Sequence, residues 1–105
     1  MWFKMSFLEH SARIPLIVHW PKQFAPRRVK SPVSLVDLLP TLTDLASGGK
    51  SSDFVTPMDG RSLFPYLSGD TGSNDVVGEY FAEGTDTPIF MIRRGALKAI
   101  YSEKD

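Results

Sequence analysis

The sequence contains no cysteine, which excludes a disulfide framework. A chain without disulfides is compatible with a reducing compartment, and we expect a cytoplasmic protein. The N-terminus lacks the basic start and long apolar core of a signal peptide, and no apolar run is long enough to span a bilayer. We therefore expect no membrane partner.

Charge of one sign is not in excess, because 12 acidic residues balance 12 basic ones. This balance excludes a general electrostatic attraction to nucleic acid or membranes. A basic cluster lies within residues 22–30, and Phe24 is the one aromatic residue within that stretch. A solvated loop explains such a cluster better than an RNA-binding surface, so we expect no nucleic-acid partner.

Motifs for self-contained catalysis are also missing. The two histidines, His10 and His19, are nine residues apart, and neither belongs to a cluster with metal-ligand spacing. The sequence has no Asp-Asp pair, no nucleophile elbow with a Ser-His-Asp set and no glycine-rich phosphate loop. It therefore predicts neither a metal ligand nor a nucleophile within this chain.

A nearly continuous apolar run is present at Leu16–Trp20, between Pro15 and Pro21. A continuous run, rather than an alternating one, is typical of a strand that is covered on both faces in a parallel sheet. A buried helix is the alternative, but the distance between the two prolines is too short for one. We predict a buried strand over residues 15–20.

Helical patterns follow. Ser34 and Asp37 have the spacing of a capping box, leucines recur at helical intervals behind them, and Gly48 is a stop signal. This predicts a helix over 34–47 that kinks or restarts at Pro40. A second helix is expected over 61–68, with Asp59 as its cap.

The periodicity becomes strand-like after a loop-forming run that begins at Ser68. We predict strands at 76–83, 88–94 and 97–101, with Gly95 in the last turn. The chain then divides into residues 1–70, which hold the buried strand and the helices, and residues 71–105, which hold a small antiparallel sheet.

A single lysine, Lys4, lies in an apolar neighbourhood near the N-terminus. Such an ammonium group either extends to water or meets an anion. From spacing alone, an ordinary surface lysine is the favoured interpretation.

Four stretches of the sequence resemble the sulfatase family, and two of them resemble bacterial choline-sulfatases more narrowly. The two narrower ones are residues 2–21, with Glu-His-Ser-Ala-Arg-Ile-Pro, and residues 78–84, with Gly-Glu-Tyr-Phe-Ala-Glu-Gly. The broader ones are Asp-Leu-Leu-Pro-Thr-Leu at 37–42 and Asp-Gly-Arg-Ser-Leu-Phe-Pro-Tyr-Leu at 59–67. The resemblance implies an α/β fold, namely a C-terminal fragment of an alkaline-phosphatase-like sulfatase. It covers almost the whole chain.

The resemblance also implies roles for individual residues. Lys4 inherits the contact with the sulfate ester, and Glu9 with Arg13 is expected to form a structural ion pair. Alternation along a strand places Glu79, Phe81 and Glu83 on one face. Carboxylates beside an aromatic ring suit a quaternary ammonium group, so we assign choline to Glu83 first and Glu79 second, with Phe81 beside them. From the residues alone, an ordinary solvent-exposed face is favoured.

In the complete enzyme, the resemblance implies a formylglycine nucleophile and a divalent cation such as Ca²⁺, neither of them held by this chain. We therefore expect a fragment that needs the missing N-terminal half to hydrolyse choline sulfate, and an oligomer is compatible with the sequence. One alternative is a fragment of another sulfatase or of a phosphonate monoester hydrolase. The other is a non-catalytic interaction module.

Overall fold

The computed structural model describes residues 6–48, 57–72, 74–81 and 85–103. The chain divides into two compact units, of which the first joins Met1–His19 to Asp75–Asp105 and the second is Trp20–Asn74. This differs from the expected division into residues 1–70 and 71–105, because the N-terminal residues group with the sheet. None of the helices within the described ranges is both long and apolar enough to cross a bilayer.

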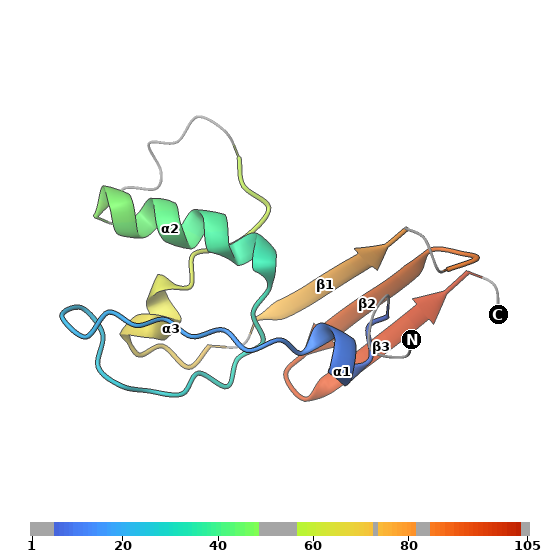
Figure 1. Ribbon diagram of the computed structural model, residues 1–105, viewed down its shortest axis with the longest axis horizontal. Helices are drawn as coiled ribbons and strands as arrows, with labels where there is room; N and C mark the ends of the chain where they lie inside the picture. The colour runs from blue at the N-terminus through green and yellow to red at the C-terminus, as the bar shows by residue number, and fades with distance from the viewer. Residues whose placement is uncertain (1–5, 49–56, 73, 82–84, 104–105) are drawn as a thin grey trace. The chain divides into compact units, whose positions relative to one another are not determined.

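The first unit is built on a three-stranded antiparallel sheet in the order β1-β2-β3, coloured orange to red in Figure 1. The strands are β1 (Asp75–Tyr80), β2 (Ile89–Arg94) and β3 (Leu97–Ser102). They are found where the sequence predicts strands, although β1 ends at Tyr80 and the expected end of that strand lies partly outside the described residues. Gly95 has a φ of 57° in the turn between β2 and β3, a conformation that favours glycine.

One face of this sheet is covered by the N-terminal segment of the same unit. Gly78 pairs with Met91 across β1 and β2, and a Cβ atom at Gly78 would lie 2.5 Å from Phe7 Cε1. Only glycine therefore lets the Phe7 ring approach this strand so closely. The short helix α1 (Glu9–Ala12) follows Phe7 directly. On the other face, Val77 and Glu79 are exposed.

The second unit carries a helix in the expected place. A single 3₁₀ turn, η1 (Leu35–Asp37), leads into α2 (Leu38–Ser47), and Gly48 ends it with a φ of 65°. The expected capping box between Ser34 and Asp37 is present. Pro40 lies in the first turn of α2, where a backbone N–H has no partner within the α-helix, so the helix restarts before it.

The second predicted helix is shorter than expected, since α3 spans Phe64–Ser68. Asp59 does not cap it. Leu63 occupies the N-cap position, and the Phe64 N–H donates to Ser62 Oγ at 3.2 Å. The helix thus begins three residues later than predicted, and the Arg61 N–H, which a cap at Asp59 would bind, is accepted by Asp37 Oδ1 instead.

A buried polar interlock joins α2 to the segment before α3. Asp37 Oδ1 accepts the Arg61 N–H at 2.9 Å, and Thr41 Oγ1 accepts the Leu63 N–H at 2.8 Å while it donates to the Asp37 carbonyl. A Cβ atom at Gly60 would overlap the Val36 carbonyl, so glycine is required at this close approach. The interlock therefore joins the two broader sequence motifs, at 37–42 and 59–67.

The buried strand expected at residues 15–20 is not formed in this structure. These residues have no regular secondary structure, and Ile17 is 86% exposed. The physical reason is that a parallel strand needs hydrogen-bonded neighbours on its edges. No described residue forms a strand pair with residues 15–20. An apolar run alone therefore does not make a strand.

Little of the described chain forms a hydrophobic core. Leu63 and Met91 are its buried hydrophobic side chains, one in each unit. Large apolar residues remain exposed in both units, among them Ile14, Leu42 and Leu97. The described residues thus leave much apolar surface without cover.

Candidate functional site

Two of the predicted site residues, Lys4 and Glu83, lie outside the described residues. The other two, Glu79 and Phe81, are described and lie at the end of β1 on the exposed face of the sheet. Glu79 is directly opposite Phe90 on β2, which places a carboxylate beside an aromatic ring.

Aromatic rings follow one another across this face. Phe81 meets Phe90 edge to face, with 5.6 Å between ring centroids. Phe90 in turn stacks on Tyr101 of β3, with centroids 6.4 Å apart and ring planes inclined by 30°. We call Phe81, Phe90, Tyr101 and Glu79 the aromatic face, and its rings with one carboxylate have the chemistry that attracts an organic cation.

The sequence did not single out Phe90 and Tyr101. Both lie in strands that the sequence predicts, but their place beside Glu79 depends on the register between strands. That register pairs Glu79 with Phe90 and Phe90 with Tyr101. The two-residue turn at Gly95 sets the register between β2 and β3, so it could have predicted the pairing of Phe90 with Tyr101.

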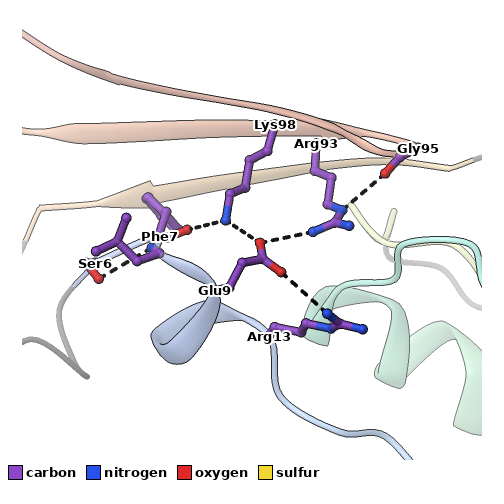
Figure 2. A network of polar contacts seen from close by, with 8 residues as sticks. Ser6, Phe7, Glu9, Arg13, Arg93, Gly95 and Lys98 are labelled. Carbon is purple, nitrogen blue, oxygen red and sulfur yellow. Dashed lines mark hydrogen bonds and ion pairs between the residues drawn. The ribbon is translucent and has the colours of Figure 1, made fainter.

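The covered face of the same sheet carries a charged cluster, shown in Figure 2. Lys98 Nζ donates to Glu9 Oε1 at 2.5 Å and to the Phe7 carbonyl at 2.7 Å. Arg93 Nη1 donates to the same Glu9 oxygen at 3.1 Å. We call Phe7, Glu9, Arg93 and Lys98 the N-terminal clasp, because they tie the segment before and within α1 to β2 and β3.

The expected ion pair of Glu9 with Arg13 is present but is the weaker contact. Arg13 Nη1 lies 4.0 Å from Glu9 Oε2, and its side chain is 79% exposed. The hydrogen bond from Lys98 is the main cause that lowers the pKa of Glu9. Desolvation raises this pKa, but the charges of Lys98 and Arg93 lower it further. Glu9 therefore stays ionised to lower pH than a free glutamate.

The described residues do not fit a metal site. Within the described ranges, no group of three or more histidine, cysteine and carboxylate side chains comes together. The sequence also has no cysteine, and none of its serines lies in the Ser-x-Pro-x-Arg motif from which a formylglycine would be made. A metal ion and this nucleophile would have to be held by residues other than the described ones.

Comparison with known proteins decides the family. The family model described as Sulfatase matches residues 4–49. A choline-sulfatase of Rhizobium meliloti (strain 1021) is 42% identical over 106 residues, which cover 100% of this chain. The chain belongs to the sulfatase family.

Other relatives of this sulfatase chain are named for other substrates. Arylsulfatase K of Rattus norvegicus is 33% identical over 112 residues and covers 96% of the chain, whereas the steryl-sulfatase of Mus musculus is 43% identical over 63 residues and covers 59%. The chain spans 20% of the length of the choline-sulfatase, 19% of the arylsulfatase and 10% of the steryl-sulfatase.

Proposed function

We propose that this sulfatase chain is the C-terminal portion of a choline-sulfatase-like enzyme, a sulfuric ester hydrolase that converts choline sulfate and water to choline and sulfate. The observation that carries this proposal is the identity of 42% to a choline-sulfatase along the whole chain. Because the chain spans only 20% of that relative, the activity belongs to a longer assembly that supplies the nucleophile and the metal.

The aromatic face supports a choline-binding role for the end of β1. A quaternary ammonium group carries charge and methyl groups but no hydrogen-bond donor, so it binds to carboxylates and to the faces of aromatic rings. Glu79 and Phe81 lie together on this face, with Phe90 beside both. We assign the ammonium group to Glu83 and Glu79 with Phe81, and each well-placed ring contributes about 0.5–2 kcal/mol to such binding.

Lys4 takes the other end of the substrate in this proposal. Its ammonium group would donate to the sulfate oxygens as negative charge develops on them during ester cleavage. A well-placed donor of this kind lowers the barrier by about 3 kcal/mol. The support is the lysine's position in the matched stretch of the sequence, because the family model begins at residue 4.

A hybrid enzyme tests the proposal directly. The chain replaces the matching segment of the Rhizobium meliloti choline-sulfatase, and hydrolysis of choline sulfate is measured. We expect an active hybrid, and we expect Lys4→Ala to lower kcat/KM by about 100-fold. Glu83→Gln should raise KM for choline sulfate and leave KM for an aryl sulfate unchanged. A folded hybrid without activity would contradict the proposed function. Full activity in the Lys4 variant would contradict the contact between Lys4 and the sulfate ester.

A second candidate is an arylsulfatase, which the match to arylsulfatase K over 96% of the chain favours. The same hybrid separates the two, because the ratio of kcat/KM for choline sulfate and aryl sulfate reports which substrate the chain's residues select. A ratio shifted toward the aryl ester, relative to the parent choline-sulfatase, would favour the second candidate.

A further inference from the structure

One side of α2 carries a row of exposed apolar side chains. Four of them recur at intervals of four, three and four residues, which places them on the same side of the helix and of the 3₁₀ turn before it: Leu35, Leu39, Leu42 and Ala46. The three leucines are between 61% and 64% exposed, and Ala46 is exposed as well. We call these four residues the leucine stripe.

Another side of α2 is already occupied by its own unit. Asp37 and Thr41 are buried, and they accept the main-chain N–H groups of Arg61 and Leu63 at 2.9 and 2.8 Å. The interlock therefore fixes which side of the helix faces the second unit. Because of it, α2 cannot turn to bury the leucine stripe there.

The composition of α2 is typical of a helix that is buried on all sides. Asp44 is the one charged residue in Leu38–Ser47. A helix at the surface of a protein carries polar and charged residues on its outer side, whereas a helix that is apolar all round lies inside a larger structure. The residues that flank the stripe are uncharged too, namely Leu38, Thr43 and Leu45. The surface that fits this side of α2 is therefore apolar and uncharged.

The size of the leucine stripe indicates what covers it. With 10 residues, α2 is about 15 Å long, so one side of it offers much less than the roughly 800 Å² per partner that separate chains bury in a stable complex. A second copy of the chain is therefore poorly suited. Another part of the same polypeptide needs no such area, because the covalent connection keeps its effective concentration high.

Length supplies the candidate. The leucine stripe lies within residues 4–49, which the sulfatase family model matches. The whole chain corresponds to 20% of the choline-sulfatase to which it is similar, so most of that enzyme has no counterpart among these residues. The complete enzyme thus contains ample polypeptide to cover the stripe.

We propose that the leucine stripe is the surface on which the N-terminal portion of the complete enzyme packs, through an apolar and uncharged face. This inference rests on the proposed function in one respect, namely that the chain acts as part of a longer enzyme. It gives α2 a role in assembly and none in binding choline or sulfate.

Thiol labelling of the 105-residue chain and of the hybrid enzyme tests the proposal. The chain has no cysteine, so Leu42→Cys introduces one thiol on the stripe, and peptide mass spectrometry follows its alkylation in both proteins. We expect fast alkylation in the 105-residue chain and alkylation at least about 10-fold slower in the hybrid, because access limits the reaction of a thiol. Ala46→Cys repeats the measurement in case the first substitution prevents folding.

Two further substitutions serve as controls. Arg28→Cys lies in the exposed basic cluster and should react fast in both proteins. Leu63→Cys replaces a buried side chain and should react slowly in both, which reports that the second unit is folded. Fast reaction of Leu63→Cys in the 105-residue chain would overturn the proposal, since the stripe would not be the surface of a folded unit. Equal protection of Arg28→Cys and Leu42→Cys in the hybrid would overturn it as well.

The rates for Leu42→Cys decide between the possible occupants. Fast alkylation in both proteins would mean that the stripe stays bare, and slow alkylation in both would mean that the enzyme's N-terminal portion is not what covers it. Either result overturns the proposal. In the second case, a rate that rises on dilution of the 105-residue chain would identify a second copy as the occupant.

Activity separates failure of this inference from failure of the proposed function. A hybrid that protects Leu42→Cys but does not hydrolyse choline sulfate would contradict the proposed function and leave the packing surface supported. An active hybrid in which Leu42→Cys reacts fast would do the reverse. A hybrid that does not fold would show that the chain does not fit the rest of the enzyme, and it would overturn the packing surface.

Discussion

Two polar networks hold this chain together, and they differ in burial and in reach. The interlock of the second unit is buried, with Asp37 4% and Thr41 5% exposed, and it joins residues 22 to 24 positions apart. The clasp of the first unit is partly exposed, with Glu9 45% exposed, and it joins residues 89 positions apart. The interlock uses fixed main-chain donors, whereas the clasp uses mobile charged side chains.

This difference in burial determines whether each network responds more to substitution or to pH and salt. A buried acceptor that is removed leaves main-chain N–H groups without partners, and the loss is nearly independent of salt. A partly exposed ion pair contributes less to stability and responds to pH and salt. We therefore expect substitutions to break the interlock and solution conditions to loosen the clasp.

The largest effect is expected for Asp37→Ala. The change removes the acceptor of the Arg61 N–H and of the Ser34 N–H, and we expect the free energy of unfolding to fall by about 3 kcal/mol. Urea denaturation measures this loss. Asp70→Ala is the control, because Asp70 also accepts a main-chain N–H, from Gly72, but at an exposed site, so its loss should stay below about 1 kcal/mol. Similar losses for both variants would contradict the importance of burial.

Thr41→Val should have the next largest effect. Valine keeps the shape but cannot accept the buried Leu63 N–H, so we expect a loss of about 2 kcal/mol in the same assay. Thr43→Val is the matched change in the same helix, where the hydroxyl only donates to the Pro40 carbonyl, and it should cost less than about 1 kcal/mol. The interlock is not needed for stability if the two threonines behave alike.

Acid should loosen the clasp without breaking the interlock. Because the folded pKa of Glu9 is lowered, its contribution to stability is present above the unfolded pKa and is lost as pH falls through the folded value. We expect amide exchange of residues 11–13, corrected for intrinsic rates, to accelerate below about pH 4. Glu9→Gln should show faster exchange already at neutral pH, while Glu79→Gln on the opposite face should not. Identical pH profiles for the wild type and Glu9→Gln would rule out Glu9 as the sensitive group.

The smallest effect on stability is expected on the exposed face of the sheet. This face contains neither the interlock nor the clasp. Tyr101 is 62% and Leu97 78% exposed. Changing either to serine should alter the free energy of unfolding by no more than about 0.5 kcal/mol. Both changes should instead lower the fluorescence of a dye that binds apolar surface. A loss above 2 kcal/mol would mean that this face is covered in solution.

Local patterns predicted the elements well because their causes are local. Short stretches rich in β-branched and aromatic residues mark β2 and β3, and Gly95 marks the turn between them, since a residue there needs a positive φ. The leucine periodicity and Gly48 likewise mark α2 from its own side chains and its own stop signal. The cap at Asp59 was wrong because the helix begins only at Phe64 and the Arg61 N–H is bound by Asp37, from a distant part of the chain.

Long-range pairing could not be predicted from the sequence. Glu9 finds Lys98 and Arg93 because the sheet brings them together, and nothing in the residues near Glu9 points to them. The register that sets Phe90 and Tyr101 beside Glu79 is equally a property of the assembled strands. The assignments of Lys4 and Glu83 concern residues beyond the described ranges and stay predictions.

By itself, the sequence determined the family, the places of most helices and strands, and the absence of cysteine, because these depend on residue identities and on short-range periodicity. Tertiary structure alone decided that Phe7 lies on Gly78, that Lys98 holds the Phe7 carbonyl, and that the apolar run at 15–20 has no partner strand here. The reason is physical: an apolar run states only a preference for burial, whereas a strand or a clasp exists only where another part of the chain supplies the opposing groups.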